Sequence, residues 1–268
     1  MKGLATPLVV LQLLLMIPIQ SEAQRCRCGK VNRRSRFPRE IEPHIFGPQA
    51  QRTEVNEYPW HVGVVRRYSR SGKPHCGGSI IAPRYVLTAA HCTSVTRNKR
   101  IGRTFSPREI QVVVGEHNIG DRWADRRAVS RILQHPYYQY AGRTGREVLH
   151  YDFSIVTLAR SIRFSYRMSP ICLPASAHSQ YTGRTATVSG WGRTSWEGPQ
   201  PQTLLETTMQ VRPNRRCETS QQNFYSHICA YGYGSGVCHG DSGGPMSVIE
   251  NGRYRYLLCR FFKSITIR

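Results

Sequence analysis

Acidic side chains are scarce in this chain of 268 residues. It carries 16 Asp and Glu against 38 Lys and Arg, which gives a formal net charge of +22 at pH 7. Such a field attracts polyanions through a salt-dependent, sequence-independent interaction. Heparin-like glycans are therefore candidate partners, and a basic but merely solvated surface is the alternative. No zinc-finger spacing or RNA-binding aromatic motif accompanies the charge, which argues against a specific nucleic-acid partner.

Long apolar runs are also scarce, with one exception near the start. Lys2, the apolar residues 8–17 and the small-residue site Ser21-Glu22-Ala23 are typical of a signal peptide, so we expect 1–23 to be removed. The apolar residues are fewer than the roughly 18–20 that span a membrane, and no second run follows. The sequence therefore predicts a secreted, extracellular protein with no membrane partner after signal removal.

Low-complexity tracts and internal repeats are lacking, whereas cysteine is not. The nine cysteines favour an oxidising compartment, which agrees with export. The stretch 24–44 is basic, contains proline and has no periodicity, so it is expected to be a pro-segment or linker.

Short β-rich runs separated by turn signals follow from residue 57 onward. The first set has the six members of a small closed barrel: 61–65, 78–81, 85–88, 110–114, 130–133 and 153–158. Residues 163–174 cross over to a second set of five: 186–190, 204–211, 227–230, 245–249 and 254–258. The pattern predicts an all-β fold of two packed antiparallel barrels, the second one strand short.

The segment Gly240-Asp241-Ser242-Gly243-Gly244-Pro245 can present a nucleophilic serine. Glycine at 240 permits backbone conformations that a side chain would penalise. The N–H groups of Gly240 and Ser242 can then converge on an oxyanion, where one donor is typically worth roughly 3–4 kcal/mol. Asp241 is expected to hold the loop by ion pairing.

A serine hydroxyl needs a base, and His91 in Thr88-Ala89-Ala90-His91-Cys92 is the candidate. Asp152 precedes an apolar run and could fix the imidazole tautomer. Taken singly, the Ser242 motif is more often a turn, His91 more often a disulfide neighbour and Asp152 more often a strand end. Together, in the order His, Asp, Ser, they indicate the catalytic triad of an acyl-transfer enzyme.

With Tyr58-Pro59-Trp60-His61-Val62, these motifs resemble the chymotrypsin/trypsin-like serine proteases, and in particular secreted arthropod members of the venom or haemolymph type. The resemblance runs to about Leu258. It implies a protease domain, 45–258, of two packed six-stranded antiparallel Greek-key barrels with the site between them, acting on protein substrates. It implies no organic cofactor. No calcium is expected either, because Trp123 and Arg126 stand where some relatives carry acidic ligands.

The resemblance also implies a disulfide framework. It pairs Cys76 with Cys92, Cys217 with Cys229, and Cys172 with either Cys28 or Cys26. Two further cysteines, Cys238 and Cys259, have no evident partner in the family pattern.

Substrate choice follows from the residue six before the nucleophile, which forms the floor of the family's specificity pocket. Here it is Gly236, with Val237 beside it, so the floor carries no charge. We therefore expect cleavage after apolar or small residues, because a buried basic side chain would be unpaired. His239 is placed at the pocket rim, or else is an exposed loop histidine.

Activation in this family creates an Ile-Val-Gly-Gly N-terminus whose ammonium pairs with the aspartate before the nucleophile. This chain offers Ile45 and Asp241 for that pair, but His44 precedes Ile45 and is a poor site for a trypsin-like cut. A basic cluster at 33–36 is the alternative cleavage region.

The last ten residues, 259–268, depart from the family pattern, so the strand that would close the second barrel is not recognisable. An open second barrel would expose unpaired backbone edges. We expect a chain with this ending to have little or no peptidase activity. The rival to a peptidase is therefore a catalytically inactive, protease-like binding protein.

Overall fold

A computed structural model describes residues 28–32, 50–97, 100–141, 148–175, 181–195, 197–213, 228–232 and 236–258. The expected signal peptide, Ile45, Cys217 and the tail 259–268 lie outside these ranges. Regular structure in the described residues is all strand apart from a 3₁₀ turn, η1 (His91–Thr93). None of the described helical segments is long and apolar enough to cross a membrane. The all-β prediction is confirmed.

The first half of the chain forms a closed antiparallel barrel, with strand order β11-β4-β3-β2-β7-β8. In one of its strands the alternate residues Ser154, Val156 and Leu158 are buried, as a strand with one face in a core requires. The six expected runs are its six strands. They are β2 (His61–Arg66), β3 (Cys76–Ala82), β4 (Tyr85–Thr88), β7 (Ile110–Val114), β8 (Asp125–Gln134) and β11 (Ser154–Leu158).

The second half forms an open antiparallel sheet, with order β1-β13-β12-β15-β16 and with β14 paired to β13. Five of its strands match the five expected runs, and β1 adds a sixth. The strands are β1 (Gln51–Arg52), β12 (Thr185–Gly190), β13 (Leu205–Arg212), β14 (Cys229–Tyr231), β15 (Pro245–Glu250) and β16 (Arg253–Leu258). The expectation of an incomplete second barrel is therefore confirmed.

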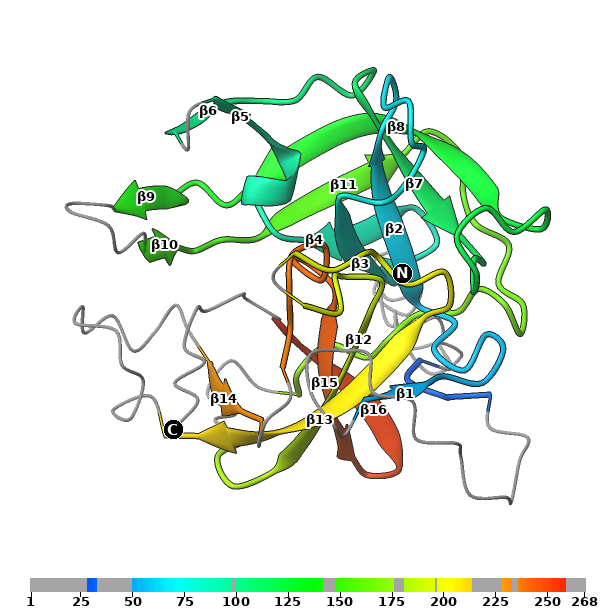
Figure 1. Ribbon diagram of the computed structural model, residues 1–268, viewed down its shortest axis with the longest axis vertical. Coiled ribbons are helices and arrows are strands. Elements are labelled where there is room, and N and C mark those ends of the chain that lie inside the picture. The colour runs from blue at the N-terminus through cyan, green and yellow to red at the C-terminus, as the bar shows by residue number, and fades with distance from the viewer. Residues whose placement is uncertain are drawn as a thin grey trace, which may run out of the picture.

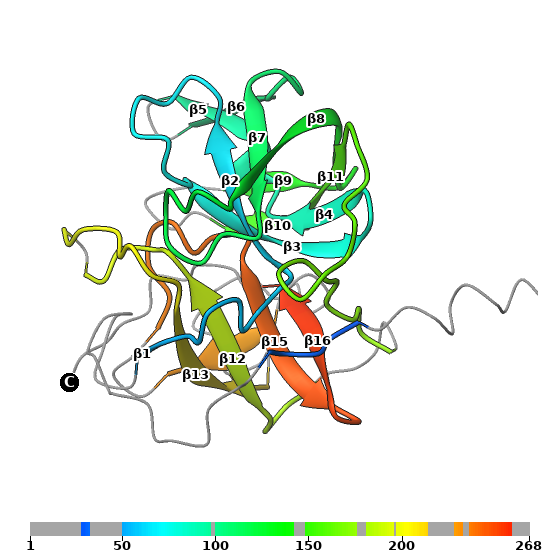
Figure 2. The ribbon, with the colours of Figure 1, turned by 90° about the vertical axis from the view of Figure 1, so that its right-hand side faces the viewer.

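The barrel and the open sheet are stacked, with β3 and β15 at their junction (Figures 1 and 2). Two small hairpins extend the barrel half. They are β5 (Ser94–Arg97) with β6 (Arg100–Thr104), and β9 (Gln139–Ala141) with β10 (Val148–His150). The rings of Trp60 and Tyr254, 5.6 Å apart, join the barrel core to the second sheet.

The outer edge of β16 is partly paired, contrary to the expectation of an exposed edge. Tyr254 N–H donates to Gly29 O over 2.9 Å, and Tyr256 N–H donates to Cys172 O over 2.8 Å. Gly29 has φ +68°, and any Cβ there would collide with the Tyr254 backbone. Gly29, in the described part of the basic segment, and Cys172 therefore cover part of an edge that would otherwise invite pairing with another chain.

Candidate active site

Two paired strands of the barrel bring His91 and Asp152 together. Strand β4 ends at Thr88, just before His91, and β11 begins at Ser154, just after Asp152. Thr88 and Ser154 are register partners in the antiparallel pair. The loops that carry the two side chains therefore leave the barrel side by side.

Asp152 holds His91 at two points. Asp152 Oδ2 lies 2.7 Å from His91 Nδ1, and Asp152 Oδ1 accepts the His91 backbone N–H over 2.9 Å. The Asp152 side chain is 1% exposed and that of His91 is 25% exposed. Because a carboxylate accepts at Nδ1, the proton of a neutral imidazole is held there, and Nε2 is left without a proton and able to act as a base.

Ser242 lies in the turn before β15, pressed against the barrel. Its carbonyl oxygen accepts the Gly77 N–H over 2.9 Å and lies 3.4 Å from Cys92 Sγ. At Gly243, with φ +77°, a side chain would collide with Thr88 Oγ1 on the strand that leads to His91. The structure thus puts the side chains of His91 and Asp152 in direct contact and places the Ser242 backbone beside Cys92, the residue after His91.

No hydrogen bond joins Ser242 Oγ to His91 Nε2 in the described structure. Contacts of this kind commonly tighten only when substrate is bound.

The turn around Ser242 carries two N–H groups that donate to nothing among the described residues, those of Gly240 and Ser242. Asp241 N–H, by contrast, donates to Cys238 O over 3.0 Å. Gly240 has φ +106°, and a Cβ there would lie 3.0 Å from Gly192 Cα, which leaves room for glycine alone. Unpaired N–H groups beside a hydroxyl can stabilise an oxyanion that forms there.

Asp241 is buried beneath the same turn. Its carboxylate accepts the N–H groups of Gly192 over 2.7 Å and Cys238 over 2.9 Å. Burial raises the pKa of Asp241 to about 6, although these two hydrogen bonds act to lower it. No cation pairs with the carboxylate among the described residues, so the expected ion pairing of this loop does not occur there.

Two of the disulfides implied by the family resemblance are present in the structure. Cys76 and Cys92 are joined, with S–S 1.97 Å, and so are Cys28 and Cys172, with S–S 2.11 Å. Cys229 is disulfide-bonded, and its expected partner lies outside the described residues. Cys238 is a buried free thiol whose pKa is raised by burial.

A cluster of possible metal ligands lies at the site, because the ligand atoms of Cys76, His91 and Cys92 are within 4.8 Å of one another. The two sulfurs are bonded to each other, so they provide no thiolate for a metal. The cluster is therefore a disulfide packed against the imidazole.

Gly236 is buried and Val237 half-buried, beside the turn that carries Ser242. No described atom lies within 4 Å of the position that a Cβ on Gly236 would occupy. Gly236 thus brings no carboxylate to the site predicted for the specificity pocket. His239 is exposed, next to Gly240.

Sequence reasoning missed the buried His61 behind the nucleophile turn. Its Nδ1 lies 3.0 Å from Ser189 Oγ, and its ring meets the edge of Trp191 at 4.8 Å. Burial lowers the pKa of His61 to about 3, so the ring is neutral and packs as part of the core. No local pattern distinguishes such a histidine from an exposed one.

Comparisons with known proteins agree with this geometry. A profile of the Trypsin family matches residues 47–257. Venom serine protease 34 of Apis mellifera is 30% identical over 84% of this chain and 51% of its own length. Venom serine protease of Polistes dominula is 29% identical over 85% of this chain and 75% of its own length. Serine protease filzig of Drosophila melanogaster is 34% identical over 80% of this chain and 13% of its own length.

This chain thus spans about half the length of the honeybee relative and a small part of the fly relative. The match nevertheless includes the His91, Asp152 and Ser242 segments together with both β units. The chain belongs to the Trypsin family of serine proteases.

Proposed function

We propose that this protein is a secreted serine endopeptidase that uses Ser242 as nucleophile, His91 as general acid and base, and Asp152 as the residue that orients His91. The observation that carries the proposal is the double contact of the Asp152 carboxylate with the His91 ring and backbone. That contact leaves Nε2 as the free base, which acyl transfer requires.

In this mechanism Ser242 Oγ attacks the carbonyl carbon of the scissile peptide bond while its proton passes to His91 Nε2. The oxyanion that forms accepts the N–H groups of Gly240 and Ser242. His91 then gives its proton to the departing amine, and the C–N bond breaks to leave an acyl ester on Ser242. A water molecule, deprotonated by His91, releases the acid and restores the serine.

Substrate choice is proposed to favour apolar or small residues before the cut, since Gly236 contributes no charge. A peptide-library digest tests this preference. Cuts confined to the carboxyl side of Arg and Lys would overturn it. The variant Gly236→Asp should move cleavage towards Arg and Lys, because it adds a carboxylate that pairs with a basic side chain, and no described atom occupies the position of its Cβ.

Activation is proposed to supply a cation to Asp241. A buried carboxylate whose pKa is raised to about 6 is stabilised by a nearby ammonium group, such as a new N-terminus. Ile45 is the candidate, released by a cut that is not trypsin-like because His44 precedes it. Mass spectrometry of the active chain identifies the terminus, and an Ile45 terminus produced by trypsin alone would contradict this route.

The test of the whole proposal is covalent labelling. A fluorophosphonate probe should modify Ser242 in the processed chain, located by mass spectrometry of the peptide that contains it. Ser242→Ala should abolish the label, and Asp152→Asn should slow it. Absence of label in folded, processed protein would favour the rival function, a protease-like binding protein, which the open second sheet supports.

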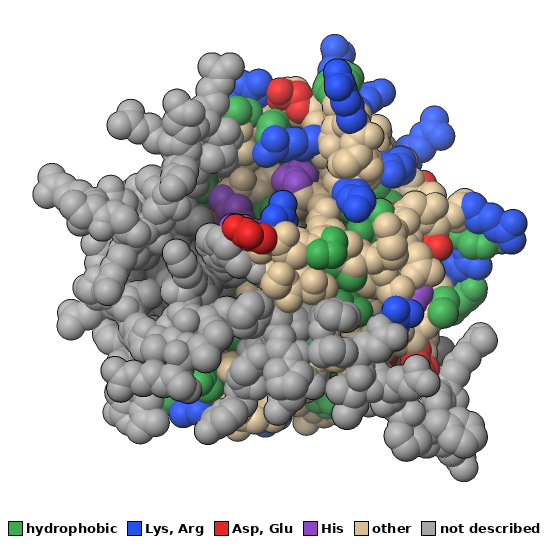
Figure 3. All heavy atoms as spheres, viewed as in Figure 1, with side chains coloured by type: hydrophobic (Ala, Val, Ile, Leu, Met, Phe, Trp, Pro, Cys, Tyr) green, Lys and Arg blue, Asp and Glu red, His purple; other side chains and the backbone are tan. Residues whose placement is uncertain are grey.

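Polyanion binding is a second proposed property, based on charge. Figure 3, which has the view of Figure 1, shows Lys and Arg side chains spread over the barrel half of the molecule. Retention on heparin that falls steeply with salt would support it. Elution at low salt would contradict it.

A further inference from the structure

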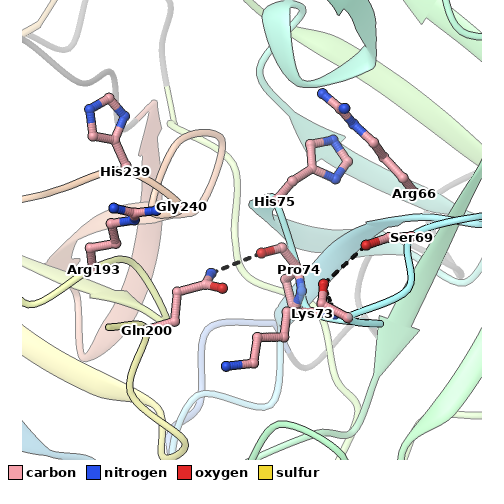
Figure 4. A pocket seen from close by; sticks show the side chains of 10 residues that line it. Arg66, Ser69, Lys73, Pro74, His75, Arg193, Gln200, His239 and Gly240 are labelled. Atoms are coloured by element: carbon pink, nitrogen blue, oxygen red, sulfur yellow. Dashed lines mark hydrogen bonds between the residues drawn. The ribbon is translucent and has the colours of Figure 1, made fainter. Parts of the chain in front are cut away.

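A cavity of about 360 Å³ lies beside the candidate site, between the barrel and the second half of the molecule. One wall carries Arg193, His239 and Gly240, and the other carries Arg66, Lys73 and His75 (Figure 4). Gln200 spans the two walls, because its Nε2 donates to Pro74 O over 3.0 Å. The volume is at the small end of the range of ligand pockets and suits one or two side chains.

The charges of this cavity, which we call the basic groove, are all of one sign. Arg66, Lys73 and Arg193 line it, and none of its lining residues is acidic. None of the three cations makes an ion pair with a described residue. Burial lowers the pKa of His75 to about 4, so this ring is neutral near pH 7 and does not share the positive charge.

Two of the cationic residues are anchored, Arg66 by its side chain and Arg193 by its backbone. Arg66 lies over the ring of Phe105, with Cζ 5.6 Å from the centroid. The backbone N–H of Arg193 donates to His239 O over 2.8 Å, which fixes the main chain of Arg193 beside the residue before Gly240. A guanidinium that already rests on a ring loses less conformational entropy when it binds an anion than a mobile lysine would.

The groove lies on the side of the site from which the leaving peptide departs. In acyl transfer the departing amine takes its proton from His91 Nε2, so the first residue after the cut lies against that atom. Cys92 Sγ is 3.6 Å from His91 Nε2, and His75 Nε2 is 3.0 Å from Cys92 O. The groove therefore begins next to this disulfide. Gly236 and Val237, proposed to receive the side chain before the cut, do not line it.

We infer that the basic groove selects substrates with an Asp or Glu within the first three residues after the scissile bond. The inference rests on the proposed peptidase function. A carboxylate there accepts charge-assisted hydrogen bonds from Arg193 and Lys73, and Arg66 adds attraction at longer range. An extended peptide advances about 3.3 Å per residue, so these three residues cover the length of a cavity of this size.

The experiment uses paired fluorogenic peptides that differ only by Glu or Gln at each of these three positions, with an apolar residue before the cut. We expect kcat/KM to be about tenfold higher for Glu than for Gln at one position, the effect of charge-assisted hydrogen bonds. In Arg193→Gln with Lys73→Gln this ratio should fall to twofold or less. A Glu-to-Gln ratio near one in the unaltered chain would overturn the inference.

The matched control is Arg67→Gln. Arg67 is the exposed neighbour of Arg66, does not line the groove, and carries the same charge. It should leave the ratio unchanged, and an equal loss in this variant would show that only the overall positive field is at work.

Binding separates failure of the inference from failure of the peptidase proposal. The same peptides are titrated against Ser242→Ala by fluorescence polarisation, which needs no turnover. Tighter binding of the Glu peptide, lost in Arg193→Gln with Lys73→Gln, supports the groove even if the unaltered chain cleaves nothing. Equal binding of the two peptides overturns it, whether or not the unaltered chain is active.

Discussion

The closed barrel and the open sheet contribute unequal parts of the candidate site. The barrel carries His91 and Asp152, on loops fixed by the pairing of β4 with β11. The second half carries Ser242 and Gly240, on a turn whose position depends on contacts with its neighbours. Strand pairing therefore fixes the proposed base, and close approach of the backbone across the junction fixes the proposed nucleophile.

The buried core centred on the barrel is also larger than the buried core of the second sheet. Within the described residues, the cluster centred on the barrel contains 22 buried side chains and that of the second sheet contains 7. A small core with an open edge opens more readily than a closed barrel. Four of the 22, Trp191, Leu204, Tyr254 and Tyr256, come from the second half, and 214–227 and 259–268 of that half lie outside the described residues.

The two halves also differ in how their buried carboxylates are paired. Asp152 is paired with a histidine, whereas buried Asp241 has only backbone donors among the described residues. The Asp152 carboxylate thus has a histidine partner as it stands, whereas the Asp241 carboxylate is the one for which we propose a cation.

The largest effect is expected from breaking the barrel's part of the site. Asp152→Asn should lower kcat by about 10⁴-fold, because an amide no longer enforces the tautomer with Nε2 free. Turnover of a chromogenic peptide by processed enzyme measures this. Asp125→Asn, at an exposed aspartate paired with Arg127, is the control and should stay within about twofold. A loss of less than tenfold in Asp152→Asn would contradict the assigned role.

Matched core truncations test the difference in packing. Leu158 in β11 and Leu257 in β16 are 0% and 1% exposed. Leu158→Ala should reduce the free energy of unfolding by about 3–5 kcal/mol, and Leu257→Ala by about 2–3 kcal/mol, since an open sheet collapses more easily around a cavity. Urea titration measures both changes. Hydrogen exchange should rise only in the second sheet for Leu257→Ala, and an equal rise in the barrel would contradict the comparison.

Much of the fold follows from the sequence because its signals are local. The barrel strands are apolar runs bounded by turn residues, and β11 shows period two directly, because Ser154, Val156 and Leu158 are buried and the residues between them are half-buried. The chemistry at His91, Asp152 and Ser242 likewise follows from residue type and order. What local patterns predict poorly are short or charged strands, such as β1 and the first half of β8.

The remaining features depend on contacts between distant residues. Gly29 covers the edge of β16 although more than 200 residues separate it from Tyr254. The basic groove joins Lys73 to Arg193, and neither lies in a motif. The raised pKa of Asp241 arises from burial, which a tripeptide motif does not specify. Long-range packing and desolvation account for all three.

Removing the Cys28–Cys172 disulfide, which lies beside the second sheet, should have an intermediate effect on stability. Cys28→Ser with Cys172→Ser opens a link between residues 144 apart in sequence, and should destabilise the fold by about 2–4 kcal/mol. Exchange of the Tyr254 and Tyr256 amides, which donate to Gly29 and Cys172, should rise first. Cys238→Ser, at a free thiol, is the control. Unchanged exchange at both tyrosines would show that the segment holds its place without the disulfide.

The smallest expected effect concerns the pH dependence of stability. Asp241 ionises near pH 3.8 when unfolded and near pH 6 when folded. Between these values the folded chain keeps a proton that the unfolded chain has lost. The contribution of Asp241 to the free energy of unfolding of the unprocessed chain should therefore fall as pH rises, by about 1.4 kcal/mol per unit and about 2–3 kcal/mol in all.

His61 acts in the opposite sense, because its pKa is lowered from 6.5 to about 3 on folding and its contribution to stability is lost as pH falls. The test is therefore a difference between variants. Asp241→Asn should remove the part of the pH slope of the unfolding free energy that Asp241 causes between pH 4 and 6. An amide accepts the two N–H groups less well, which lowers stability by the same amount at every pH and does not change the slope. Unfolding measured at half-unit intervals gives both profiles. If the two profiles are parallel, Asp241 does not titrate between pH 4 and 6. That result would contradict the difference drawn here between Asp152, which is paired with a histidine, and Asp241, which has only backbone donors among the described residues.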